Sequence, residues 1–283
     1  MKRILSTTIL LAIVSMSFGQ VETEKLKNKK GLTILPEKGN FGLGFNAVPF
    51  FNYLGNTFNG TANNTIGTDF VNSTQSIYGK YFLKDDLAIR AEFRFAVINR
   101  VKDNYVLRDN GAGQNDFVRD TRKTSASYIN IGLGAEKRRS WGRIQAFYGA
   151  SVFYGLTNNK VNYKYGNEFR VDNPTPTFTS NFETGATQNS NKRVAYVYDG
   201  SIHDIGARLF VGVEYFFMPR MSIGGEFGWG AQVQIQEDSK TNTSEYNPTT
   251  NILTDEIRNS STEQAFIMDT DNFTGAINLM VYF

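Results

Sequence analysis

Residues 273–283 read FTGAINLMVYF, and every second side chain in this stretch is apolar or small. One set of alternate residues is Phe273, Gly275, Ile277, Leu279, Val281 and Phe283, and the other is Thr274, Ala276, Asn278, Met280 and Tyr282. Strict period-two alternation is typical of a β-strand whose two faces meet different surroundings. The end of the chain therefore predicts a strand with one apolar face and one mixed face.

The beginning of the chain has the pattern of an export signal. Lys2 and Arg3 precede a short apolar segment, residues 4–16, and residues 17–19 (SFG) give a small-x-small cleavage site. We therefore expect residues 1–19 to be a cleavable signal peptide and the mature chain to begin at Gln20.

The composition restricts how the mature chain could meet a membrane. It contains no stretch of about twenty apolar residues, which a transmembrane helix would need. A closed β-barrel is the other structure that satisfies its backbone in lipid. The mean hydropathy of −0.35 agrees with a barrel, because only half of each strand is apolar.

Composition also excludes several classes of site. The chain has no cysteine, which rules out a disulfide framework, a zinc–thiolate site and a cysteine nucleophile. The formal net charge of +3 gives no indication of a nucleic-acid partner.

Eight segments of the mature chain alternate in the same way, at residues 41–53, 75–83, 87–97, 127–137, 142–156, 205–217, 221–235 and 273–283. Three connections between them are tight (84–86, 138–141 and 217–220), and four are long and polar (54–74, 100–124, 156–200 and 236–265). Outer-membrane barrels have short periplasmic turns and long extracellular loops.

The fold that we predict is an all-β, transmembrane, antiparallel up-and-down β-barrel of eight strands, occupying residues 41–283. Ten strands are the alternative, because residues 161–169 have strand-like composition within the longest loop. Residues 20–40 are polar and rich in lysine, which predicts a flexible periplasmic leader.

The faces opposite the apolar ones carry charges of both signs. Five basic and four acidic residues occupy these inward positions: Lys80, Arg90, Glu92, Arg94, Glu136, Arg143, Arg208, Glu214 and Glu226. An eight-stranded barrel is narrow enough for side chains to fill, and buried charges are tolerated when they are paired. We therefore expect a lumen plugged by a charge network. A solvated channel with a mixed-charge constriction is the alternative.

Aromatic residues on the outward faces fall near both strand ends. Tyr81, Tyr215 and Phe283 lie toward the tight connections, and Phe51, Tyr154 and Trp229 lie toward the long ones. Membrane barrels carry such aromatic belts at both interfaces, so these six residues predict the height of the barrel in the bilayer.

Residues 78–90 (YGKYFLKDDLAIR) and 206–210 (GARLF) resemble strand blocks of the OmpA-type transmembrane domain and of the porin family of small barrels. The junction at residues 18–20 (FGQ) is similar to that of exported barrels of the Bacteroidota. The resemblance implies a location in the Gram-negative outer membrane, with lipid and lipopolysaccharide as neighbours. It also implies recognition by the barrel-assembly machinery through the strand ending at Phe283.

The chain has one histidine, His203, close to Ser201 and Asp204. Ser201 and His203 share one face of a strand at about 6–7 Å, which is too far for a nucleophile and its base. No EF-hand loop and no phosphate-binding glycine motif is present, so we expect no enzyme, metal or cofactor site.

Two functions remain open, with a third as a minor alternative. The first is a non-enzymatic barrel with a structural or interaction role, whose extracellular loops meet a protein partner that the sequence does not name. The second is a narrow, porin-like barrel that transports a small solute or a hydrophobic molecule. The minor alternative is an outer-membrane lipid hydrolase.

Overall fold

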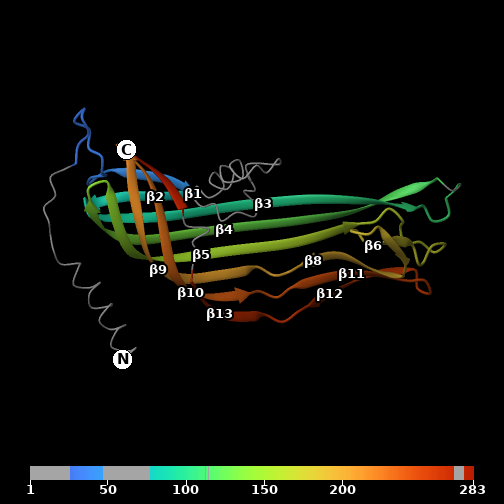
Figure 1. The fold of residues 1–283 in the computed structure, drawn as a ribbon. Helices are drawn as coiled ribbons and strands as arrows, with labels where there is room; N and C mark the ends of the chain where they lie inside the picture. Colours follow the sequence, from blue (N-terminus) through green and yellow to red (C-terminus); the bar gives the residue numbers. More distant parts are fainter. Residues whose placement is uncertain (1–25, 47–76, 112, 114, 271–276) are drawn as a thin grey trace, which may run out of the picture.

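The computed structural model describes residues 26–46, 77–111, 113, 115–270 and 277–283, and the part it describes is all-β (Figure 1). Among these residues, no helix is long and apolar enough to cross a bilayer. The strands are β1 (Phe41–Asn46), β2 (Ile77–Lys84), β3 (Leu87–Leu107), β4 (Phe117–Trp141), β5 (Ile144–Lys164), β6 (Thr177–Asn181), β7 (Ala186–Asn189), β8 (Lys192–Tyr198), β9 (Ile202–Met218), β10 (Met221–Gln236), β11 (Lys240–Asn247), β12 (Ile252–Asn259), β13 (Glu263–Thr270) and β14 (Ile277–Tyr282).

Eight of these strands pair in a closed antiparallel ring. The order is β1, β2, β3, β4, β5, β9, β10 and β14, and β14 pairs again with β1. Leu43 faces Val281 across the closing pair, and Phe41 and Phe283 exchange two backbone hydrogen bonds of 3.2 and 2.7 Å. Each of the eight predicted segments overlaps one ring strand, although β3, β4 and β5 extend beyond the predicted bounds. The alternative of ten ring strands is not what the pairing shows.

One end of the ring carries the tight connections, and we call it the turn end. Three of its strand pairs are joined between Lys84 and Leu87, between Trp141 and Ile144, and between Met218 and Met221. Gly142 and Arg220 adopt positive φ angles of 58° and 60° in two of these turns. Two tight connections lie where the sequence predicted them, and the third lies at residues 142–143 instead of 138–141 because β4 continues to Trp141. The C-terminus lies at the same end of the ring (Figure 1).

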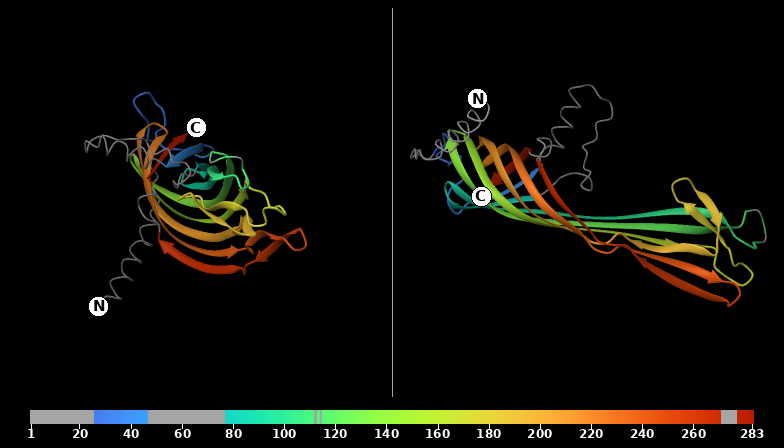
Figure 2. Two further views of the ribbon diagram at one scale, coloured as in Figure 1. Left: turned by 90° about the vertical axis from the view of Figure 1, so that its right-hand side faces the viewer. Right: turned by 90° about the horizontal axis from the view of Figure 1, so that it is seen from below.

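At the other end, the strands continue as an open sheet, which we call the arm (Figures 1 and 2). The last β2 partner in β3 is Phe93, but β3 stays paired with β4 as far as Leu107. Along β5, β8 takes over from β9 as the partner strand, and β11 and β12 extend the sheet from β8. The arm comprises residues 98–107, 117–127, 157–164, the hairpin β6–β7, and strands β8, β11 and β12.

The arm corrects the prediction of long loops at residues 100–124, 156–200 and 236–265. Most of these residues form strands. Both faces of these strands are polar or exposed to solvent, as in β12. Such strands have no apolar alternation, and the sequence pattern therefore did not show them. The fourth predicted loop, residues 54–74, lies outside the described residues.

The hairpin β6–β7 is fastened to the arm by hydrogen bonds and ion pairs. Asp120 is fully buried and accepts hydrogen bonds from the backbone N–H groups of Gly166 and Thr179, at 2.8 and 2.7 Å. Glu183, in the turn of the hairpin, pairs with Lys102 of β3 and Arg122 of β4, both at 2.6 Å. The hairpin is therefore held against the strands that leave the ring.

Residues 26–40 are docked at the turn end, which differs from the flexible leader expected from their lysines. Ile34 is 2% exposed and packs with Phe82, Phe216 and Tyr282. The carbonyl oxygen of Ile34 accepts a hydrogen bond from the N–H of Arg220 at 3.0 Å. Ile34, with Leu26 and Leu35 packed against the same cluster, thus covers the turn end of the ring.

Replacing Ile34 with alanine should lower the free energy of unfolding by about 2–4 kcal/mol, because it removes a fully buried branched side chain. The measurement is urea-induced unfolding of the purified protein in detergent. Leu32→Ala is the control, since Leu32 is 57% exposed two residues away. Equal midpoints for the two variants would show that the leader is not docked.

Lowering the pH should release the hairpin β6–β7. Hydrogen bonds from Lys102 and Arg122 lower the pKa of Glu183 from 4.5 to about 2. The carboxylate is more acidic in the folded state, so its stabilisation is complete above pH 4.5 and is lost as the pH falls through 2. Spin labels at Asn99 and Thr187 should report a lengthened distance near pH 2, and Glu183→Gln should lengthen it at pH 7. Glu168→Gln, which affects only an exposed pair with Arg170, should leave the distance unchanged; the same lengthening there would exclude Glu183 as the fastening group.

Candidate functional site

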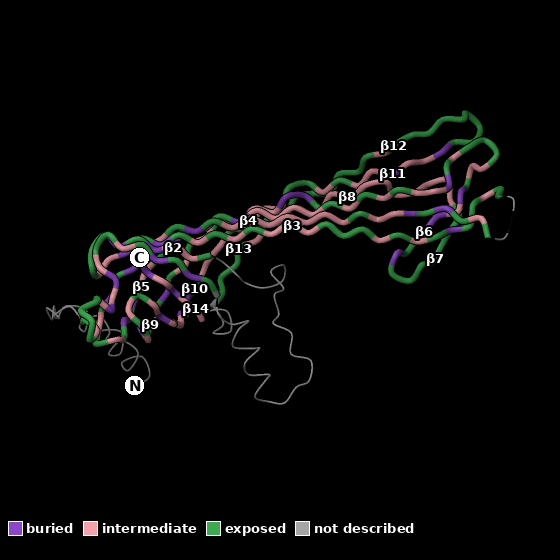
Figure 3. Tube along the Cα trace, turned by 90° about the horizontal axis from the view of Figure 1, so that it is seen from above, coloured by how far each residue is buried: buried purple, intermediate pink, exposed green. Residues whose placement is uncertain are grey.

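The interior of the ring near the turn end holds eight charged side chains, which we call the ion-pair network. They are four cations and four carboxylates: Lys80, Arg90, Arg138, Arg208, Glu92, Glu136, Glu214 and Glu226. Strand alternation brings them inward, because on each strand they occupy the positions that alternate with those of the outer face. Figure 3 shows the buried positions gathered along these strands.

One half of the network is a closed set of two cations and two carboxylates. Lys80 contacts Glu136 at 3.1 Å and Glu214 at 2.7 Å. Arg138 contacts the same two carboxylates, at 2.5 and 2.6 Å. Tyr282 and Ser222 also donate hydrogen bonds to Glu214, at 2.6 and 3.2 Å. Each carboxylate is thus shared by two cations, which compensates for the loss of water around them.

The other half is centred on Arg90. Its guanidinium contacts Glu226 and Glu92 at 2.6 Å each, and Arg208 binds the second oxygen of Glu226. Arg90 also lies 3.8 Å from Glu136, which links the two halves. Five strands, β2, β3, β4, β9 and β10, therefore meet through one set of charges.

Aromatic rings complete the packing around the cations. Lys80 lies 4.6 Å from the centre of the Phe147 ring, and Arg90 lies 4.3 Å from that of Phe210. Cation–π contacts stabilise desolvated cations. The side chains of Lys80, Arg90, Arg138, Glu136, Glu214 and Glu226 are at most 5% exposed, whereas Arg208 and Glu92 are 18% and 22% exposed.

Gly149 permits the close packing of aromatic rings around the cations. A Cβ atom there would lie 2.1 Å from the carbonyl oxygen of Ala135 and 2.7 Å from the ring of Phe210. The absence of a side chain therefore lets the Phe210 ring, which carries Arg90 on its face, approach β5 closely.

Seven of the nine charged residues predicted for the lumen belong to the network, and two do not. Arg94 lies 4.8 Å from the ring of Tyr128, nearer the arm. Arg143 donates hydrogen bonds to the backbone carbonyls of Phe216 and Phe217 at the turn end, at 3.0 and 3.1 Å. Arg138 is a member of the network that was not predicted, because it was expected to lie in a tight turn. Its even number continues the inward set of residues 127–137 by one step, and this signal could have identified it.

The interior becomes less buried toward the arm. Arg94, Asn130 and Asp204 are partly exposed, in contrast to the buried residues at the turn end. Asp204 accepts hydrogen bonds from the side-chain amides of Gln232 and Gln234, at 3.4 and 2.9 Å. The network therefore fills one end of the ring, whereas partly exposed polar and charged side chains occupy the other.

The outer face of the ring is apolar and exposed. Of the predicted aromatic residues, Tyr81, Tyr215 and Phe283 lie near the turn end, while Tyr154 and Trp229 lie farther along the ring strands, and all five are exposed. Phe51 lies outside the described residues. Trp141, which is 86% exposed at the end of β4, was not predicted for a belt.

His203 lies on the outer face but is not joined to Ser201. Its ring contacts the hydroxyl of Tyr154 at 2.8 Å and Glu237 at 3.3 Å. The Ser201 hydroxyl instead contacts Tyr198 at 2.5 Å and Asn158 at 2.9 Å. Ser201 and His203 therefore do not contact each other, although both interact with the carboxylate of Glu237. The described residues also contain no group of three or more histidines and acids that could hold a metal ion.

The chain gives no match to a protein-family model, a curated protein or a solved structure. Its function therefore has to be inferred from the ring, its interior and the arm.

Replacing Glu214 with glutamine should lower the free energy of unfolding by about 3–5 kcal/mol, because Lys80 and Arg138 would each lose a buried partner. Chemical unfolding in detergent measures the loss. Glu92→Gln is the matched control inside the ring. Its effect should be smaller because Glu92 is partly exposed and, among the described residues, forms an ion pair with Arg90 only. A Glu214→Gln midpoint equal to that of the native protein would mean that these charges are solvated.

Proposed function

We propose that the protein is an integral outer-membrane β-barrel with a closed lumen, and that it holds the arm outside the cell as a surface for interaction. The apolar outer face of a ring whose interior charges are paired is the observation that carries the proposal. The proposed role is structural or interactive and involves no catalysis.

The outer face supports insertion in a bilayer. Side chains such as Phe93, Leu133, Val152 and Leu209 are 47–63% exposed. The outer face carries no charge over a band that begins at the level of Lys137, near the turn end, and ends at the level of His203, toward the arm. This holds for the described parts of all eight ring strands. Water-soluble proteins rarely expose an apolar surface beyond a few hundred Å². Lipid is the environment in which such a face is stable.

The height of this face fits a membrane. From Leu87 to Val97 the strand rises about 34 Å at ~3.4 Å per residue, and a tilt of ~40° reduces this to about 26 Å. The apolar band of outer-membrane barrels is about 25 Å tall. The exposed aromatic residues Tyr81 and Tyr154 would then lie near the two interfaces.

The ion-pair network supports a closed lumen. Its buried carboxylates each contact two cations, so that little space or charge remains for an ion at the turn end. A transport role, the alternative derived from the sequence, would require the network to open, and the buried side chains from five strands argue against it.

The positions of the turns support the orientation. Short connections of outer-membrane barrels face the periplasm, and long ones face the exterior. The turn end and the docked residues 26–40 would then be periplasmic, and the arm extracellular. The export pattern at residues 1–19 and the resemblance to OmpA-type and porin-family barrels of the Bacteroidota agree with this assignment. Outer-membrane lipid, lipopolysaccharide and, through β14, the barrel-assembly machinery are the partners that follow.

Reconstitution into lipid tests the proposal in two steps. The protein should float with liposomes after alkaline washing, because the ring crosses the bilayer. In planar bilayers it should then give no steady conductance, because the ion-pair network fills the lumen. Recovery in the aqueous fraction would contradict insertion, and steady nanosiemens openings would contradict the closed lumen.

A further inference from the structure

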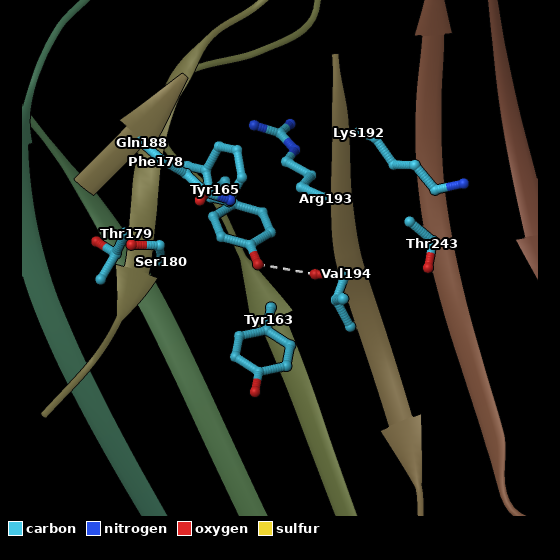
Figure 4. A pocket seen from close by; sticks show the side chains of 10 residues that line it. All are labelled: Tyr163, Tyr165, Phe178, Thr179, Ser180, Gln188, Lys192, Arg193, Val194 and Thr243. Atoms are coloured by element: carbon cyan, nitrogen blue, oxygen red, sulfur yellow. Dashed lines mark hydrogen bonds between the residues drawn. The ribbon is translucent and has the colours of Figure 1, made fainter. Parts of the chain in front are cut away.

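A groove lies on the arm, between the end of β5, the hairpin β6–β7 and strands β8 and β11 (Figure 4). Its volume is about 350 Å³, and it is open to solvent on one side. The residues that line it are Tyr163, Tyr165, Phe178, Thr179, Ser180, Gln188, Lys192, Arg193, Val194 and Thr243. Aromatic faces and polar groups therefore meet in one place on the arm.

Tyr163 and Tyr165 form a flat aromatic surface in the groove. Their rings are parallel to within 3°, with centres 6.2 Å apart, as expected for alternate residues on one face of an extended segment. Phe178 packs edge-on against Tyr165 at 5.2 Å, and the Tyr165 hydroxyl donates to the carbonyl of Val194 at 2.8 Å. These contacts hold the rings in place, so little side-chain conformational entropy is lost when a ligand stacks on them.

Arg193 supplies a cation without a carboxylate partner. It donates one hydrogen bond to the backbone carbonyl of Asn167 at 2.7 Å, and lies 4.7 Å from the ring of Tyr165 and 4.2 Å from that of Phe169. No ion pair of Arg193 occurs within the described part of the chain. Burial lowers the pKa of Arg193, in keeping with a guanidinium that is partly removed from water, while the more distant charges of Asp120 and Glu168 act in the opposite direction.

The neighbouring residue, Lys192, differs from Arg193 because it has carboxylate partners. Lys192 contacts Glu245 at 3.3 Å and Glu256 at 2.9 Å, so its charge is already compensated. An anion entering the groove would therefore gain most from Arg193, whose planar guanidinium suits a carboxylate.

We propose that this groove binds an acidic carbohydrate, with a sugar ring stacked on Tyr163 and Tyr165 and a sugar carboxylate bound by Arg193. Ser180 and Gln188 are exposed at the groove and offer a hydroxyl and an amide to the sugar hydroxyls. The open side accommodates a chain of sugars. The site depends on the fold of the arm and not on the proposed insertion in a membrane.

Titration calorimetry on the full chain in detergent tests the site, with tetramers of galacturonic acid and of glucuronic acid as probes. Neutral tetramers of galactose and glucose, which lack the carboxylates, are the matched ligands. At least one acidic tetramer should bind about tenfold more tightly than its neutral counterpart, because only it can pair with Arg193. Absence of binding for both acidic tetramers up to about 10 mM would overturn the proposal.

Three substitutions separate the two parts of the site. Arg193→Gln should reduce the affinity for the acidic tetramer to that for the neutral one. Tyr163→Ala should weaken both ligands about tenfold, whereas Tyr163→Phe should bind as the native protein does, because the stacking face remains. Arg119→Gln removes an exposed arginine from β4 and should have no effect. An equal loss in Arg119→Gln and Arg193→Gln would mean non-specific attraction by charge and would contradict the site.

Discussion

The pairing of β14 with β1 is the interaction on which the rest of the structure depends. It turns an antiparallel sheet into a ring, so the ring strands have no free edge at the turn end. Closure creates a lumen, and the lumen of an eight-stranded ring is too narrow to keep charged side chains well hydrated. The charges must then pair with one another, and the alternation of each strand separates them from the largely apolar residues of the outer face.

The most deeply buried ion pairs lie at the turn end, beside the closing strand β14. Glu136 and Glu214 lie between Lys80 and Arg138 at the turn end, and Tyr282 of the closing strand donates a hydrogen bond to Glu214. Ile34 then covers the same end with an apolar side chain. Backbone closure, charge compensation and the leader are therefore three parts of one plug. The arm lies outside this plug, where strands can have two polar faces.

The sequence was sufficient to predict the ring strands, because a ring with an apolar outer face and a charged interior requires alternation along each strand. It placed seven inward charges correctly for the same reason. Arg138 was not predicted because the tight turn was expected to begin at that residue. Ile34 was not predicted because the few apolar residues of the lysine-rich segment 26–40 form no sustained periodic pattern. The arm was missed for a physical reason: a sheet wetted on both faces needs no apolar stripe, so its strands resemble loops. The groove needs residues from β5 to β11, which only the pairing of distant segments brings together.

The central claim is that β4 crosses lipid with its odd-numbered side chains outward and its even-numbered ones enclosed. The chain has no native cysteine, so single cysteines can be introduced at residues 129–135 and labelled with nitroxides in liposomes. Collision with dissolved oxygen, which concentrates in lipid, should be high at Ile129, Ile131, Leu133 and Ala135 and low at Asn130, Gly132 and Gly134. Equal collision rates at all seven positions, or preferential access of a water-soluble nickel reagent to the odd ones, would contradict a ring that is apolar outside and ion-paired within.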